Sequence, residues 1–225
     1  MQAVAMGSLA RFADWHRVAA PCRAEGDSPF ARLLGERWLF LPPATRRRFL
    51  RKIEAGACVS YLGEVAECRM SRAGRLLAQI ARVIGAPLPL GTDIGVSACV
   101  SVTADAEGQG QYWTRQYGRA QGFPQVIHSV KRFAGPTGIE EYLGLGLGIA
   151  LRLEEAGGAL LFVSDHYFLK LGGLRLRLPN WAMPGALTVG HVDLGGGRFL
   201  FSLDLVHPRL GELVHQLCVF ADPAE

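Results

Sequence analysis

The sequence predicts an α+β fold built on a strongly curved antiparallel β-sheet or barrel of about 8–10 strands, with N-terminal helices packed on one face or end. Between residues 143 and 220 the apolar residues recur at every second position, which is the period of a β-strand. Glycine pairs or triplets at 157–158, 172–173 and 195–197 interrupt this alternation. Short turns of this kind join antiparallel neighbours. A sheet with this number of strands curls instead of lying flat.

The part of the chain before residue 91 is predicted to be mainly helical. Apolar residues at helical spacing run through 28–54, where Pro42-Pro43 ends one helix and begins the next. Residues 57–70 predict a strand, and Ser71 is a suitable N-cap for a helix over 72–84. The run Arg46-Arg47-Arg48 falls within the second helix, and we interpret it as a solvated helix face.

The rest of the chain predicts strands only. We expect one domain over residues 26–225, preceded by a loose extension over 1–25 with a short helical piece around Ser8–Ala19. The predicted strands are 95–104, 110–118, 125–134, 143–154, 158–171, 173–178, 185–193, 198–206 and 213–221.

Composition indicates an ordinary folded protein, with 49% hydrophobic residues, 20% charged residues and a net charge of +4 over 225 residues. The basic residues are scattered, so we expect no nucleic-acid partner. Five cysteines without CxxC spacing favour buried free thiols in a reducing cytoplasm over disulfides or a zinc site. No run approaches about 18 apolar residues, so we expect no transmembrane helix, and no signal peptide is recognisable.

Three sets of residues are candidates for ligand binding. Gly144-Leu-Gly146-Leu-Gly148 is no nucleotide loop, because strand-like alternation continues after it; Gly146 and Gly148 mark either close packing or a smooth wall for a flat ligand. Trp113, Arg115 and Tyr117 share one strand face. They form either a ligand platform or a surface over which the arginine extends to solvent.

The third set contains a cation inside the sheet. Lys131 and Arg132 are adjacent on a strand, so they point to opposite faces and one of them faces the interior. A buried cation needs a carboxylate partner, and Glu140 and Glu141 are close in sequence. The inward-facing cation either forms a salt bridge that fixes the loop or binds an acidic head group of a ligand inside a cavity.

Acid–base catalysis is the alternative use of the polar residues. His191 and Asp193 share a strand face and could act as a base and its orienting group, with His207, Tyr167 or Glu140 as the acid. Structural hydrogen bonding explains the same histidines. A single Glu-x-x-His spacing at 212–215 is too weak to predict a metal site, and we expect neither a metal nor a cofactor.

Several segments together resemble the bacterial domain of unknown function 4166 (DUF4166) family over roughly residues 30–222. These segments are 135–144, 158–164 with Tyr167-Phe168, 174–179, 184–189 with His191 and Asp193, and 197–202 leading to 207–212. The resemblance implies work beside a redox enzyme, since such domains are sometimes fused behind a Rossmann-type oxidoreductase. It implies no catalytic residues.

These observations lead to three hypotheses. The first is a cytoplasmic protein that binds a small, mostly hydrophobic ligand in a concave β-sheet pocket, with Arg115 or Lys131 meeting a carboxylate on the ligand. The second is a cofactor-independent acid–base enzyme acting on a small hydrophobic substrate. The third is an accessory partner of a separate oxidoreductase, which would expose an apolar patch.

Overall fold

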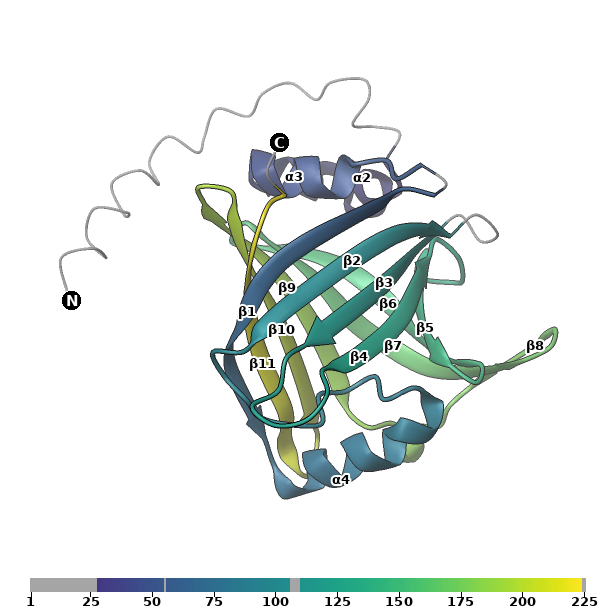
Figure 1. The fold of residues 1–225 in the computed structure, drawn as a ribbon. Coiled ribbons are helices and arrows are strands. Elements are labelled where there is room, and N and C mark those ends of the chain that lie inside the picture. Colours follow the sequence, from purple (N-terminus) through teal and green to yellow (C-terminus); the bar gives the residue numbers. More distant parts are fainter. Residues whose placement is uncertain (1–27, 55, 106–109, 224–225) are drawn as a thin grey trace.

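Ten antiparallel strands close into a barrel in the computed structural model, which describes residues 28–54, 56–105 and 110–223 (Figure 1). Neighbours around the ring follow chain order from β1 to β7, and pairing of β7 with β9 and of β11 with β1 completes it. The strands are β1 (Cys58–Met70), β2 (Ser97–Asp105), β3 (Gly110–Tyr117), β4 (Gln125–Arg132), β5 (Ile139–Gly144), β6 (Leu147–Ala156), β7 (Ala159–Leu171), β9 (Ala186–Gly195), β10 (Arg198–His207) and β11 (Gly211–Ala221). The predicted curved antiparallel fold is confirmed.

One further strand, β8 (Leu174–Arg177), pairs with the end of β7 outside the ring. The β7–β8 hairpin therefore projects from the barrel as an arm (Figure 1). The chain returns from this arm through a short 3₁₀-helix, η4 (Asn180–Ala182), to the start of β9.

Helices cover both ends of the barrel (Figure 1). At one end lie α2 (Pro29–Leu34), η2 (Gly35–Phe40) and α3 (Pro43–Leu50), while α4 (Arg72–Ile80) and η3 (Ala81–Ile84) lie across the other. The Ser71 hydroxyl accepts a hydrogen bond from the Gly74 amide at 3.1 Å, so the predicted N-cap is confirmed. The predicted extension over 1–25, with its helical piece at Ser8–Ala19, lies outside the described residues. No helix of the described part is both long and apolar enough to cross a membrane.

The strand predicted over 143–154 is wrong, because the chain reverses within it. The described predicted strands otherwise agree with the observed ones to within two residues. Leu145 and Gly146 form a tight turn with φ of +46° and +80°, which makes 139–156 a β5–β6 hairpin. Glycine permits such a turn at little steric cost. Both arms of a hairpin keep the apolar period of two, so the alternation concealed the reversal.

The arginine run on α3 does not form a solvated face. Of its three members only Arg47 is exposed. Arg48 donates hydrogen bonds to Asp222 at 2.6 and 2.8 Å and to Asp193 at 2.8 Å, and its side chain is 6% exposed. Successive helical residues point about 100° apart, so they cannot all face water when one side of the helix lies on the barrel. Arg48 ties α3 to β9 and to the end of β11.

The cysteines are only partly buried as predicted. Cys68 and Cys218 are buried, and burial raises the pKa of their thiols to about 11 and about 12. Cys99 is half-buried and Cys58, at the start of β1, is exposed. All four are free thiols, and the fifth cysteine, Cys22, lies outside the described residues.

Candidate ligand-binding cavity

The barrel interior contains two hollow spaces, one behind each set of helices. Strands β3, β9, β10 and β11 contribute inward-facing residues to both spaces. Along β10, Phe199 and Phe201 line the smaller space beneath α3, while Leu203 and Leu205 line the larger one beneath α4. Along β3 the boundary falls between Trp113 and Arg115.

The larger space is an apolar cavity of about 680 Å³. Its roof is formed by α4 and η3 together with the connection between β8 and β9, and its walls come from β5, β6, β7, β9, β10 and β11. The lining residues include Leu77, Ile80, Val83, Ile84, Leu143, Leu147, Ile149, Leu187, Val189, Leu203, Leu205 and Leu213. Polar side chains are few there, namely Arg115, Glu141, Tyr167 and His207.

A buried cluster of charges lies where the cavity meets the packed middle of the barrel. The Lys131 ammonium lies 3.1 Å from one Glu141 oxygen, and Arg115 Nη2 lies 3.5 Å from the other. Arg115 Nη2 also donates a hydrogen bond of 3.0 Å to the Ser129 hydroxyl. Burial lowers the pKa of Lys131, while Lys131 and Arg115 hold the pKa of Glu141 below its usual value against the effect of burial. The cluster therefore holds two basic groups for one carboxylate.

Arg115 and Tyr167 are two lining residues that can donate a hydrogen bond to a ligand in the cavity. Arg115 Nε is buried and has no hydrogen-bond partner among the described residues. Tyr167 also lines the cavity, and burial raises the pKa of its phenol, so the hydroxyl stays protonated and can donate. A buried donor without a partner is costly. This arrangement favours an acceptor entering from the cavity.

The predicted ligand-binding residues do not all lie at this cavity. Arg115 lines it, and Lys131 stands directly behind, paired with Glu141. Trp113 faces the smaller space, with the Lys131 ammonium 4.6 Å from its ring centroid. Tyr117 is buried but lines neither space.

The two glycines do not form a cavity wall. Gly146 lies in the β5–β6 turn, where a side chain would overlap the Lys170 backbone. At Gly148 a side chain would meet the ring of Phe168. Because Leu147 and Ile149 line the cavity, Gly148 faces outward between them. Close packing therefore accounts for both glycines.

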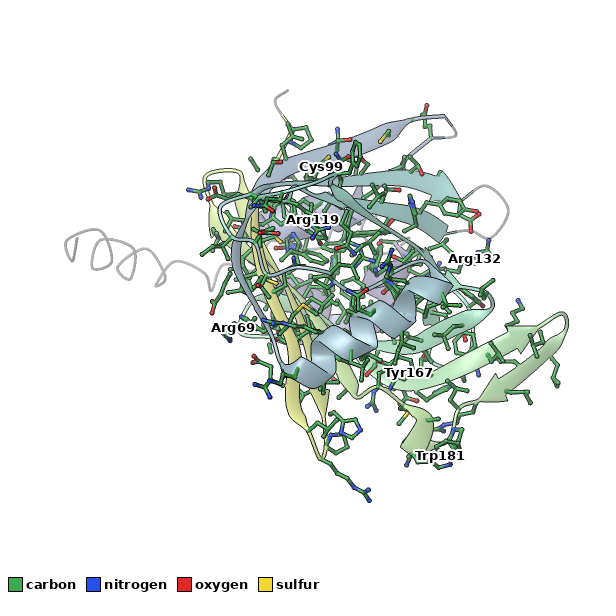
Figure 2. The ribbon with its side chains drawn as sticks, turned by 60° about the horizontal axis from the view of Figure 1, so that its bottom comes forward. Arg69, Cys99, Arg119, Arg132, Tyr167 and Trp181 are labelled. Carbon is green, nitrogen blue, oxygen red and sulfur yellow. The ribbon has the colours of Figure 1, made fainter. Side chains whose placement is uncertain are left out.

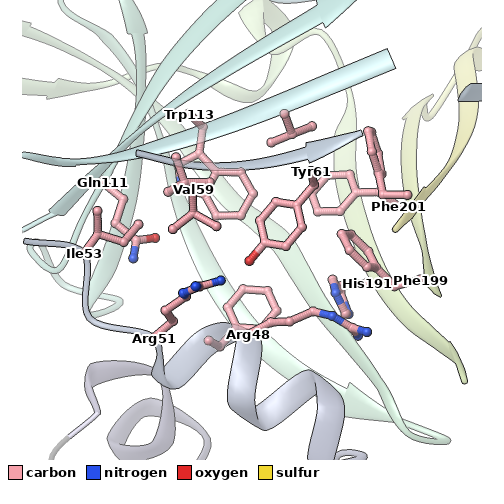
Figure 3. A pocket seen from close by; sticks show the side chains of 14 residues that line it. Arg48, Arg51, Ile53, Val59, Tyr61, Gln111, Trp113, His191, Phe199 and Phe201 are labelled. Atoms are coloured by element: carbon pink, nitrogen blue, oxygen red, sulfur yellow. The ribbon is translucent and has the colours of Figure 1, made fainter. Parts of the chain in front are cut away.

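The smaller space is a chamber of about 40 Å³ beneath α3 (Figure 3). Aromatic residues surround it, and His191 stacks on Phe199 with ring centroids 4.6 Å apart. Both ring nitrogens of His191 are buried without a hydrogen-bond partner among the described residues. Burial lowers the pKa of His191 to about 3, so the ring is neutral at pH 7.

The predicted catalytic residues are dispersed over three places. His191 faces the small chamber, and the neighbouring Asp193 binds Arg48 rather than the imidazole. Tyr167 and His207 line the large cavity, where His207 Nδ1 accepts hydrogen bonds from the backbone amides of 209 and 210. Glu140 faces outward. His191 and Asp193 therefore share no hydrogen bond, and none of the three predicted acids lines the small chamber with His191.

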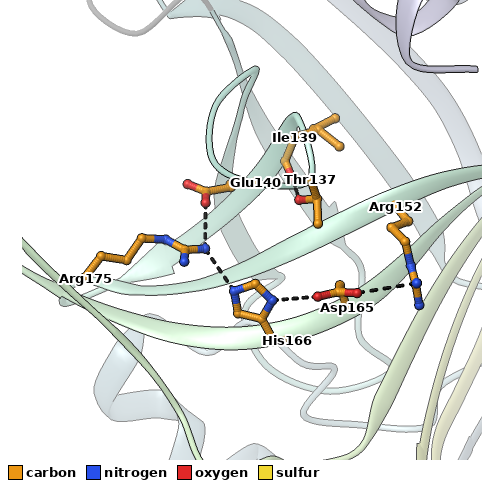
Figure 4. Close-up of polar contacts among 7 residues, drawn as sticks. All are labelled: Thr137, Ile139, Glu140, Arg152, Asp165, His166 and Arg175. Carbon is orange, nitrogen blue, oxygen red and sulfur yellow. Dashed lines mark hydrogen bonds and ion pairs between the residues drawn. The ribbon is translucent and has the colours of Figure 1, made fainter.

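Glu140 belongs to a chain of polar groups on the outer face of the barrel (Figure 4). Arg175 from β8 binds Glu140 at 2.7 Å and His166 Nε2 at 3.1 Å, and His166 Nδ1 lies 2.7 Å from Asp165. This chain anchors the β7–β8 arm. Sequence reasoning missed it because a β-bulge in β7 at Asp165 breaks the alternation and turns His166 outward.

The described residues contain no group of three or more His, Cys, Asp or Glu side chains arranged to hold a metal ion. The family model described as domain of unknown function (DUF4166) matches residues 41–220. The chain belongs to the DUF4166 family. Every residue that lines the large cavity lies inside the matched region, so the cavity is built within the DUF4166 domain itself. Searches of curated proteins and of solved structures found no match.

Proposed function

We propose that this DUF4166 protein binds a small, mostly hydrophobic ligand carrying a carboxylate, held in the large cavity with the carboxylate at Arg115. The observation that supports the proposal is an apolar cavity of about 680 Å³ ending at a buried arginine whose Nε has no partner among the described residues. Ligand pockets typically measure about 300–1,000 Å³, with mostly apolar walls and a few polar groups that fix orientation.

The apolar walls favour a ligand with a hydrocarbon body. Fifteen leucine, isoleucine and valine side chains line the cavity, and each ligand methylene that leaves water for such walls contributes about 0.8 kcal/mol. A polar ligand would lose its hydration there without replacement hydrogen bonds. The four polar lining residues are too few to satisfy a sugar or nucleotide.

The charges favour an acidic head group. Arg115 and Lys131 together exceed the single carboxylate of Glu141. Glu141 lies closer to Lys131, at 3.1 Å, than to Arg115, at 3.5 Å, and Arg115 is the one of these two cations that lines the cavity. Arginine forms strong, oriented hydrogen bonds with carboxylates. The Tyr167 hydroxyl offers a second donor at the same cavity.

The acid–base enzyme has less support. Of its five candidate residues only Tyr167 and His207 line the large cavity, and His191 with Asp193 lies at the other end of the barrel. Binding alone requires only the cavity and Arg115.

Calorimetric titration with decanoate and with the matched neutral decanol tests the proposal. We expect decanoate to bind more tightly than decanol, and Arg115→Met to weaken decanoate binding about 10- to 100-fold, because a hydrogen bond to a charged group contributes about 1.5–3 kcal/mol. Decanol affinity should change little. The exposed Arg119 provides the control Arg119→Met, which should leave both affinities unchanged.

Leu205→Trp keeps the test informative if Arg115→Met fails to fold. The added ring narrows the cavity beside β10 and should weaken the binding of both ligands. Failure of both ligands to bind the wild-type protein would refute the proposal. Unchanged affinities for both ligands in Leu205→Trp would also refute it.

A further inference from the structure

Exposed apolar side chains gather around the cavity on the α4 side. Leu76, Ile80 and Val83 form a stripe along α4 and η3 and are 64, 61 and 76% exposed. Ile80 and Val83 also line the cavity. The exposed stripe is therefore continuous with the cavity lining, although ordinary globular proteins keep such contiguous apolar surface small.

Other segments around the same cavity expose apolar residues too. Trp181 on η4 is 85% exposed, directly beside cavity-lining residues 182–184. Leu145 in the β5–β6 turn is 72% exposed, between cavity-lining residues 143 and 147. Leu210, in the β10–β11 turn, lines the cavity and is 59% exposed. Figure 2 looks toward this side, with α4 in front and Trp181 at its edge. We call these four segments, 72–84, 143–147, 170–183 and 207–213, the rim.

The rim is strongly basic. It contains seven arginine or lysine residues and one acidic residue, Glu212. Arg175 is bound to Glu140, but Arg72, Arg75, Arg82, Lys170, Arg177 and Arg209 are exposed. Positive charge flanking apolar side chains matches an anionic lipid surface, where headgroups attract basic residues and tryptophan lies at the interface.

We propose that the rim docks on an anionic membrane surface, so that the ligand passes between the bilayer and the cavity beside α4. The inferred transfer of the ligand rests on the proposed function, whereas the inferred docking rests on the rim residues alone. A bilayer fits better than a protein partner, because the exposed apolar residues surround a hydrocarbon-lined cavity and are accompanied by seven basic residues against one acidic residue.

Vesicle co-sedimentation tests the docking. Wild-type protein should partition onto vesicles of 70% phosphatidylcholine and 30% phosphatidylglycerol at least tenfold more strongly than onto pure phosphatidylcholine. Raising the salt concentration should reduce this binding, because exposed charges are screened. The double variant Leu76→Ser with Trp181→Ser, and separately Arg75→Glu, should each lower the partition coefficient several-fold. None of these three residues lines the cavity.

The control changes an equally exposed residue at the other end. Phe40 on η2 is 63% exposed and lies with α2 and α3, so Phe40→Ser should leave vesicle binding unchanged. Equal binding to neutral and anionic vesicles, or no binding, would overturn the docking. Dimerisation in analytical ultracentrifugation that the double variant abolishes, without vesicle binding, would instead identify the rim as an interface between copies and also overturn it.

Decanoate titration separates the two proposals. The double variant should bind decanoate with wild-type affinity while losing the vesicles. Wild-type protein that binds anionic vesicles but not decanoate would contradict the proposed ligand and leave the docking supported. Loss of decanoate binding in the double variant would refute the claim that these rim residues serve membrane docking and not ligand binding.

Discussion

Removing the Arg48 charge should loosen α3 from the end of the barrel. Arg48 spans three hydrogen bonds of 2.6–2.8 Å to Asp193 and Asp222, and its guanidinium lies 4.6 Å from the ring centroid of Phe199. Arg48→Met keeps much of the apolar stem but leaves two carboxylates without this partner. The Asp193 side chain is 11% exposed and that of Asp222 is 32% exposed, so the second regains water more easily.

Breaking a buried ion pair by removing one partner costs about 3–5 kcal/mol. Because Asp222 is partly solvated, we expect the lower end, about 3 kcal/mol. For a chain of this size that corresponds to a fall in Tm of roughly 6–12 °C. Urea unfolding followed by tryptophan fluorescence measures the free energy, and thermal unfolding measures Tm.

The matched control is Arg47→Met, one residue away and exposed, which should change stability by less than about 0.5 kcal/mol. A double-mutant cycle with Asp193→Asn should give a coupling energy within about 0.5–3 kcal/mol. A loss of unfolding free energy below about 1 kcal/mol for Arg48→Met would refute the role of Arg48 as the residue that holds α3. Equal losses for Arg48→Met and Arg47→Met would refute it as well.

Two further predictions concern stability. His191→Phe should flatten the dependence of stability on pH, since burial lowers the pKa of His191 from 6.5 to about 3. The unfolded imidazole takes up a proton below about pH 6.5 and the folded one does not, so wild-type stability falls on acidification, by about 2 kcal/mol from this residue at pH 5; equal slopes for both proteins in urea unfolding between pH 7 and 5 would contradict this. Gly74→Ala should destabilise by about 1–3 kcal/mol, although this change usually favours a helix, because the new methyl group would overlap the Leu213 carbonyl oxygen. Thermal unfolding beside the exposed control Gln79→Ala measures the loss, and a stabilised Gly74→Ala protein would show that α4 can move away from β11.

Local patterns predicted most of the secondary structure, with the β5–β6 hairpin as the exception. Alternation of apolar residues depends on each strand having one side in the interior, so it records both the strands and which side faces inward. It indicated that one of Lys131 and Arg132 lies inside with Glu140 or Glu141 as its partner, and the structure shows that these are Lys131 and Glu141. The N-cap at Ser71 is likewise a local interaction and was predictable.

Long-range contacts were not predictable in the same way. The partners of Arg48 lie 145 and 174 residues away in sequence. An arginine on an exposed helix face and one in a buried ion pair therefore have the same local sequence pattern. The bulge at Asp165 and the turn at Leu145 each shift which residues face inward without changing composition.

The sequence by itself determined that this chain forms curved antiparallel strands with one basic residue of the Lys131–Arg132 pair turned inward, because those properties follow from alternation along each strand. Only the tertiary structure decided that β7 pairs with β9 and β11 with β1 to complete the ring, that α4 covers one end, and that His191 and His207 lie at opposite ends. The volume and lining of the cavity follow from how all ten strands and the helices pack together, which no single segment specifies.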